Sequence, residues 1–474
     1  MSVKKIFPTL LTVFILLCLC GWYGCRSYQA YDRMSDVKMT VDEAVYIWIG
    51  MQLIENPYDY SATGYALFNE KTRERDLPSY FYRPLFKHPP LFSYSQALSL
   101  NFIPHESLRF IFPSLLAGIL MIPLAFGIGL LLNGRLTGLL AALITAMDPV
   151  RIMCSQKIWM DTMLGFFMVL GIYLFLLAMH KKKDGYFTCS GLVLGLAGLV
   201  KYPGLLAWFA VLVYVALYRR EVLRKSRFLF AAVLPVLMQL PWIGWNIRVY
   251  GWGFLTDPFA QHGGFRMPIV VILIGMAVLM FLFVFFTRFG KKPASYRPDR
   301  QSRNESVFLW ILRLGVLLAL GVFLIKDYGL QRFAFFNMPH VTWAQGYFSG
   351  APRIFYIGRM IQFNYVYLLG FIALIVPFPK GKGSGLLKTY MVIVLLFFIL
   401  WGNYQSRYIL ALIPVLAVFS SSIIVRSLKI FAEFEPPSLR LTLQSVLLIM
   451  LVLALSRTAM INHLVSFTND MCYF

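Results

Sequence analysis

The sequence carries little charge for its length. Only 14% of its 474 residues are charged and 59% are hydrophobic, whereas about a quarter of the residues are charged in ordinary soluble domains. The mean hydropathy is +0.68. A chain of this composition does not use water as its main solvent, so a soluble globular protein is excluded.

Cysteine is scarce as well, and it follows no pattern. Two of the six cysteines lie within the first apolar run and the others are scattered, so we expect structural thiols and no disulfide framework. No spacing among Cys, His, Asp and Glu resembles a zinc site. The sequence also lacks an obvious internal repeat, which disfavours the inverted-repeat transporters.

Apolar runs recur along the whole chain instead. Runs of about 17 to 25 residues are long enough to cross a hydrocarbon core of about 30 Å as a helix, and their number excludes a soluble core with one anchor. We predict an all-α polytopic membrane protein that forms a single domain over residues 1–474. The expected helices, about thirteen in all, cover residues 6–25, 107–132, 135–148, 160–179, 186–200, 203–218, 228–247, 268–287, 307–325, 360–377, 386–401, 408–425 and 441–458.

The net charge of +23 would suggest nucleic acid as the partner of a soluble protein, but here the positions of the basic residues matter more. They gather in alternate loops, because an even number of expected helices separates each cluster from the next. Under the positive-inside rule the amino terminus and these loops lie in the cytoplasm, and the carboxyl terminus lies outside. We therefore expect a bilayer and no nucleic acid. The strongest clusters are Lys181 to Lys183, Arg219 to Arg227 and Lys291 to Arg303.

Two polar segments fall on the outer side in this topology. Residues 26–87 form the longest one, and the spacing of apolar residues from Val41 to Glu55 predicts a short helix that lies along the membrane surface. Residues 326–360 are rich in Phe, Tyr and Trp, and such aromatic segments favour the headgroup level of a membrane. We expect this second segment to form an interfacial loop or lid.

An acidic pair, Asp42 and Glu43, opens the expected surface helix. Adjacent carboxylates point in different directions from a helix, so one can face a bound acceptor while its neighbour positions it or holds a cation. The plainer interpretation is that the helix dipole favours acids in the first turn of any helix. Both interpretations stay open on the sequence alone.

Basic residues stand at three further points of the outer side. Lys87 and His88 precede two prolines where the chain returns to the membrane, and they could hold a phosphate or simply lie at the interface. Lys201 and Arg407 are isolated cations at outer helix ends. Singly each suits a membrane anchor, but together they supply positive charge for an anionic lipid headgroup.

Asp161 stands at the outer mouth of the fourth expected helix. An ionisable residue at the edge of an apolar run is costly unless it has a partner, so it is a candidate functional residue. The alternative is a structural salt bridge with Lys157 or Arg151.

The ordered set of these motifs resembles the GT-C glycosyltransferases that use polyprenyl-phosphate sugars. This group contains protein O-mannosyltransferases, lipid A aminoarabinose transferases and the RgtA/B/C/D-like bacterial enzymes. The resemblance covers most of the chain and rests on motifs that are weak singly but share one order and one side of the membrane. They are Asp42-Glu43, His88-Pro89-Pro90-Leu91, Asp161, Gly198 to Pro203, and Arg407-Tyr408 followed by Pro414.

The resemblance implies a function and roles for these residues. Asp42 corresponds to the proposed general base of the family, with Glu43 as its neighbour and Asp161 as the second candidate carboxylate. His88 corresponds to the family's basic residue before the loop-end proline, so Lys87, His88, Lys201 and Arg407 are the candidates for the donor phosphate. The resemblance does not imply any one cofactor with certainty, and it leaves open whether a divalent metal takes part.

The implied reaction moves a sugar from a polyprenyl-phosphate donor to a hydroxyl of a cell-envelope glycan, lipid or protein. It proceeds with inversion and takes place on the outer face of a bacterial inner membrane. Two other classes stay open, namely a lipid or polysaccharide transporter and an enzyme similar to O-antigen ligases. A transporter places its ionisable residues near the middle of the bilayer, and a ligase relies more often on a large late outer loop rich in Arg and His.

Overall fold

Helices joined by short connections make up the described part of the computed structural model, residues 3–34, 41–61, 88–252, 355–375, 383–401, 405–434 and 437–467. No strand occurs in these ranges. The α-helices are α1 (Val3–Met34), α2 (Val41–Glu55), α5 (Leu91–Phe102), α6 (Glu106–Asn133), α7 (Arg135–Ala146), α8 (Pro149–Ser155), α9 (Met160–Lys181), α10 (Gly185–Val200), α11 (Leu205–Tyr218), α12 (Ser226–Tyr250), α16 (Phe355–Phe363), α17 (Tyr367–Ile372), α18 (Ser384–Trp401), α19 (Ile413–Phe431) and α20 (Pro437–Phe467). The 3-10 helices are η2 (Tyr202–Gly204), η3 (Arg220–Arg224) and η6 (Ser406–Leu412).

Many of these helices are suited to a bilayer. Within the described residues, six are long and apolar enough to span a membrane, and α7 and α8 pass the same test as a bent pair. Three shorter apolar helices lie in α10, in η2 with α11, and in α18. The expected all-α, multi-pass architecture is confirmed. The expected spans 268–287 and 307–325 lie outside the described residues, as do residues 62–87 and most of the aromatic segment 326–360.

The first expected helix is too short in the sequence-based assignment. α1 continues to Met34 rather than ending near residue 25. The extension is polar, which hid it from a search for apolar runs, but Ser27 and Ala30 are buried against the bundle. Tertiary packing therefore carries the helix beyond its apolar part.

Two expected helices are broken. The one predicted over 135–148 gives way to α7 and α8, which meet at an angle of 58°. Pro149 cannot continue α7, and Asp148 caps the new helix by accepting a hydrogen bond of 2.9 Å from the Arg151 amide. The one predicted over 360–377 is divided at Asn364, whose side chain accepts a hydrogen bond from the Val366 amide in place of a helical bond.

The helix α5 has no counterpart among the expected helices. It follows the proline pair and carries the polar residues Ser93, Gln96 and Ser99 on its buried side. Gln96 and Ser99 donate hydrogen bonds to the carbonyls of Phe110 and Arg109 in α6. Because these polar groups lower the hydropathy of the segment, its sequence does not predict a membrane helix.

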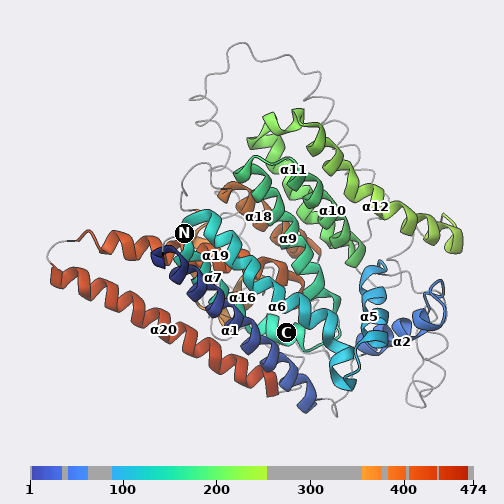
Figure 1. Cartoon of the computed structure of the whole chain (residues 1–474), viewed down its shortest axis with the longest axis horizontal. Helices are drawn as coiled ribbons and strands as arrows, with labels where there is room; N and C mark the ends of the chain where they lie inside the picture. Colours follow the sequence, from blue (N-terminus) through green and yellow to red (C-terminus); the bar gives the residue numbers. More distant parts are fainter. Residues whose placement is uncertain are drawn as a thin grey trace.

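The bundle is layered around α9 and α10. α9 packs against α6, α10 and η6, while α10 also packs against α12. Figure 1 shows α12 at one margin of the molecule and α20 at the other, next to α1. None of the apolar window of α20 is buried inside the protein, so its many exposed large side chains require lipid as their surroundings.

α2 and α5 lie side by side at one end of the bundle (Figure 1). The apolar face of α2, formed by Val45, Ile49 and Leu53 at helical spacing, packs against Ala97 of α5 and Trp242 of α12. This hydrophobic cluster fixes the orientation of α2. With α2 held in this way, its amino-terminal end lies toward the start of α9.

A buried arginine closes the break between α7 and α8. Arg151 has no exposed surface, and its guanidinium donates hydrogen bonds to the carbonyls of Thr145 in α7 and Gly118 in α6. Its own carbonyl accepts a hydrogen bond of 2.9 Å from the Tyr23 hydroxyl of α1. The carboxylate of the cap, Asp148, accepts one of 2.7 Å from Tyr367. The Thr145 carbonyl, whose helical donor would be the amide of residue 149, a proline, is thus satisfied within the protein.

The contact between α10 and α12 is close enough to require a glycine. A Cβ atom added at Gly191 would overlap the backbone carbonyl of Ala231. Because both groups belong to backbone, neither side chain motion nor a change of rotamer relieves the overlap. Gly21 in α1 is the opposite case, since a Cβ there meets nothing within 4 Å.

We therefore expect Gly191→Ala to lower the stability of the purified protein by about 1 to 3 kcal/mol, the usual cost of overpacking. The apparent midpoint of thermal unfolding in detergent measures this effect. Gly21→Ala is the matched control and should leave the midpoint unchanged or slightly raised, because alanine is the better helix former. Equal midpoints for both variants would contradict the assigned crossing of α10 and α12.

Candidate active site

The acidic pair of α2 divides into one buried and one accessible carboxylate. The side chain of Glu43 is 3% exposed, and its carboxylate lies 3.7 Å from the Lys157 ammonium. It also accepts a hydrogen bond of 3.2 Å from the Ile158 amide. The side chain of Asp42 is 53% exposed. Glu43 thus ties the first turn of α2 to the segment before α9, and Asp42 stays open to a substrate.

Asp161 in the first turn of α9 binds two cations. Its Oδ1 lies 2.9 Å from Nζ of Lys201, and its Oδ2 lies 3.8 Å from Nε of Arg407. The Asp161 side chain is 4% exposed, so its charge needs both partners and the helix dipole to offset the cost of burial. Lys201 immediately follows α10 and Arg407 belongs to η6, so this carboxylate joins three distant parts of the chain.

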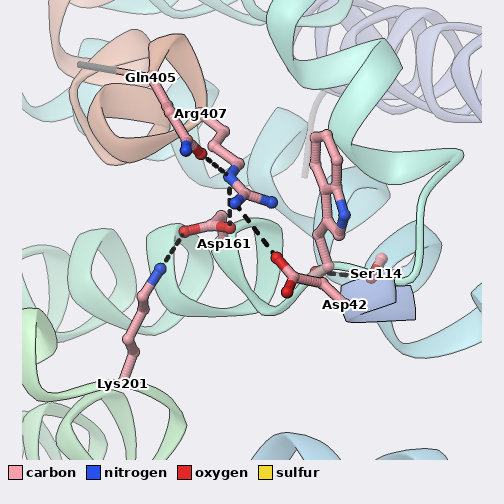
Figure 2. A network of polar contacts seen from close by, with 7 residues as sticks. Asp42, Ser114, Asp161, Lys201, Gln405 and Arg407 are labelled. Atoms are coloured by element: carbon pink, nitrogen blue, oxygen red, sulfur yellow. Dashed lines mark hydrogen bonds and ion pairs between the residues drawn. The ribbon is translucent and has the colours of Figure 1, made fainter. Parts of the chain in front are cut away.

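Arg407 also reaches the accessible acid of α2. Its Nη2 lies 3.5 Å from Oδ2 of Asp42, while its Nε donates a hydrogen bond of 2.6 Å to Gln405. The guanidinium carbon lies 4.3 Å from the centre of the Trp159 ring, and the Trp159 carbonyl is held by Ser114. Figure 2 shows the resulting chain of contacts from Lys201 through Asp161 and Arg407 to Asp42.

Aromatic side chains line this group of charges. The Lys201 ammonium lies 4.7 Å from the centre of the Tyr408 ring, which stacks on Phe398. Tyr46 is buried one turn after Asp42. Burial raises the pKa of Tyr46 well above its ordinary value, and the negative charge of Asp42 adds to this effect. Tyr46 is therefore a neutral phenol at physiological pH, able to donate a hydrogen bond and unsuited to act as a base.

The structure brings most of the predicted site residues together. Asp42, Asp161, Lys201 and Arg407 form one connected network, and Glu43, the neighbour of Asp42 on α2, pairs with Lys157. The ring of His88 lies 6.2 Å from that of Tyr46, the residue one turn after Asp42. Lys87 lies outside the described residues.

The alternative partners considered for Asp161 were wrong. Lys157 pairs with Glu43 instead, and Arg151 bonds the carbonyls near the helix break. These two residues were considered because they are near Asp161 in the sequence, whereas the observed partners Lys201 and Arg407 come from distant parts of the chain. Lys201 and Arg407 are consequently not isolated cations.

Two residues of the site, Trp159 and Gln405, were not singled out from the sequence. Each lies two residues from one that was, Asp161 or Arg407, and only this position could have indicated them. Within the described residues, no group of three or more His, Cys, Asp and Glu side chains could hold a metal ion.

The arrangement places the accessible carboxylate of Asp42 close to two cations, Lys201 and Arg407, that Asp161 holds in fixed positions. An accessible carboxylate can remove a proton from a hydroxyl, and cations fixed by a buried carboxylate can stabilise a phosphate without moving during the reaction. The geometry therefore suits transfer of a group away from a phosphate to a hydroxyl.

About a third of the chain matches a known family model. Residues 87–245 match the family model of dolichyl-phosphate-mannose-protein mannosyltransferases. None of the curated proteins matches the sequence.

Solved structures share the fold. ArnT from Cupriavidus metallidurans bound to undecaprenyl phosphate aligns with a TM-score of 0.54 and 12% identity, over 100% of this chain and 77% of that one. The oligosaccharyltransferase of Archaeoglobus fulgidus in the apo form aligns with a TM-score of 0.55 and 14% identity, over 95% of this chain and 56% of that one. AglB from Archaeoglobus fulgidus in complex with an inhibitory peptide and a dolichol-phosphate gives a TM-score of 0.54 and 15% identity over the same shares. The expected GT-C fold is confirmed.

The buried position of Asp161 leads to a prediction about stability. Asp161→Asn leaves Lys201 and Arg407 without their shared counter-ion, and loss of one partner of a buried pair costs about 3 to 5 kcal/mol. Asp42→Asn removes an exposed contact, for which about 1 kcal/mol or less is expected. Thermal unfolding in detergent without substrate should thus show a clear fall in midpoint for Asp161→Asn alone. Equal midpoints for the two variants would show that Asp161 does not hold the network.

Proposed function

We propose that this chain, a membrane glycosyltransferase of the GT-C superfamily, transfers a sugar from a polyprenyl-phosphate donor to an acceptor hydroxyl on the extracytoplasmic face. The observation that carries the proposal is the network in which Arg407 and Lys201 flank the buried Asp161 while Asp42 remains accessible. The acceptor is a hydroxyl of a cell-envelope glycan, a lipid or a protein. The enzyme lies in a bacterial inner membrane.

The placement of the network along the helices supports an outward-facing site. Asp161 is at the start of α9 and Lys201 at the end of α10. The exposed lysines 181 to 183 lie at the other end of α9, and Arg219 and Arg220 lie at the far end of α11. Because basic loops mark the cytoplasmic side, the network belongs to the opposite side. We propose that segments 26–87 and 326–360 belong to this outer side and to the same single domain, residues 1–474.

The two cations suit a lipid-linked donor. ArnT binds undecaprenyl phosphate and AglB was solved with a dolichol-phosphate, and a phosphate of this kind would contact Lys201 and Arg407 here. The donor is a phosphodiester with one negative charge, and the polyprenyl phosphate that leaves can carry a second. Lys201 and Arg407 stabilise this growing charge. Lys87 and His88 are proposed as further contacts of the same phosphate.

Asp42 is the proposed general base. Its carboxylate accepts the proton of the acceptor hydroxyl while that oxygen forms a bond to the anomeric carbon. The bond between the anomeric carbon and the phosphate oxygen breaks at the same time, and the electron pair leaves with the polyprenyl phosphate. Attack opposite to the leaving phosphate inverts the anomeric centre, and one base is sufficient because phosphate needs no proton to depart.

The remaining two acids act through other groups. Glu43 contacts Lys157 and the Ile158 amide, so its role is to position Asp42. Asp161 already binds two cations and is almost fully buried, so it fixes the phosphate site instead of removing a proton.

Loss of the gene identifies the donor. A deletion strain should accumulate one polyprenyl-phosphate sugar and lack the corresponding sugar on one envelope glycan, lipid or protein. Mass spectrometry of lipid-linked sugars and of envelope glycans measures both changes, and a strain complemented with the intact gene should restore both. Unchanged pools of every lipid-linked sugar would contradict the proposed donor class.

Replacement of Asp42 tests the base. Asp42→Asn keeps the size and much of the hydrogen bonding but removes the basicity, so transfer by the purified enzyme should fall by about 10² to 10⁴ fold. Glu43→Gln should reduce transfer less, because Glu43 only positions its neighbour. Near-normal turnover of Asp42→Asn would refute this mechanism and make Asp161 the candidate catalytic carboxylate.

A further inference from the structure

Most of the Arg407 side chain is held in place before any donor arrives. Its Nε donates a hydrogen bond of 2.6 Å to Gln405 and lies 3.8 Å from Asp161. Its guanidinium plane rests over the indole of Trp159, with 4.3 Å between the guanidinium carbon and the ring centre. These contacts fix one edge and one face of the guanidinium.

The other edge of the guanidinium meets Asp42 only weakly. The distance of 3.5 Å between Nη2 of Arg407 and Oδ2 of Asp42 exceeds the roughly 2.7 to 2.9 Å of a strong charge-assisted hydrogen bond. The Asp42 side chain is more than half exposed, whereas that of Arg407 is 14% exposed. Arg407 therefore presents its outer edge to the accessible acid through a contact that water and salt weaken.

The charges of the network also balance. Lys201 and Arg407 carry two positive charges, and Asp42 and Asp161 carry two negative ones (Figure 2). An anionic phosphate binds this neutral group most strongly if one of the two carboxylates moves away from its cation. Asp161 is buried between both cations, so the carboxylate that can withdraw is Asp42.

We infer that Asp42 and the donor phosphate compete for the outer edge of Arg407, so that donor binding releases the base. The inference rests on the proposed function. In the free enzyme Arg407 holds Asp42 away from catalysis. A phosphate has two oxygens that match the guanidinium fork and replaces the single long contact to Asp42. The freed carboxylate then accepts the acceptor proton, and the donor binds before the acceptor.

The competition predicts an unusual effect of removing the catalytic carboxylate. Asp42→Asn should bind the lipid phosphate more tightly than the wild type, by about two- to five-fold, the equilibrium effect expected for an exposed ion pair. Titration of the purified protein in detergent at low ionic strength, with undecaprenyl phosphate as the probe, measures the affinity. Glu55→Gln is the matched control, because it removes the same charge from the other end of α2, about 20 Å away at 1.5 Å per helical residue, and should leave the affinity unchanged.

A double-mutant cycle separates competition from simple repulsion between Asp42 and the phosphate. If Arg407 is shared, the gain from Asp42→Asn shrinks in an Arg407→Gln background, because no shared cation remains. Arg407→Lys keeps the charge beside Asp161 but not the fork, and should reduce the gain as well, which guards against a folding defect in Arg407→Gln. An equal gain in all three backgrounds overturns the inference and leaves repulsion as its cause.

The outcomes also distinguish this inference from the proposed function. Wild-type protein that binds no undecaprenyl phosphate at any ionic strength contradicts the proposed donor class itself. Wild-type protein that binds the probe, with Asp42→Asn gaining no more than Glu55→Gln, overturns only the sharing of Arg407.

Discussion

The buried carboxylate of Asp161 is the constraint on which the site depends. A charge that is 4% exposed at the edge of a helix bundle is tolerated only with cations beside it, and these come from the end of α10 and from η6. One carboxylate thereby sets the separation of Lys201 and Arg407. The cation pair is preorganised because the cost of reorganisation is met when the protein folds.

The accessible part of the site depends on a different kind of force. α2 is placed by apolar packing of Val45, Ile49 and Leu53 and by the pairing of Glu43 with Lys157. Among the described residues, the carboxylate of Asp42 has only the weak contact with Arg407. A rigid ionic centre thus faces a carboxylate on a separately packed helix, which lets the base respond to what binds between them.

The sequence predicted the multi-helix fold and the common side of Asp42, Asp161, Lys201 and Arg407, because apolar runs and basic loops determine which helix ends lie together. The pairing of Lys157 with Glu43 could not be predicted, since it depends on tertiary contacts between α2 and the start of α9. The helix α5 was not predicted because its buried face is polar. The helix break at Asp148 and Pro149 was not predicted because a proline in an apolar run shows where a bend can form but not whether it does.

The fully buried Arg151 has a consequence for the order in which these helices can pack. Its side chain is permanently charged, and a buried charge is tolerated only where polar groups surround it. The carbonyls that receive its protons belong to α6 and α7. The native position of α8 therefore depends on α6 and α7 being already in contact, so these three helices form one cooperative unit.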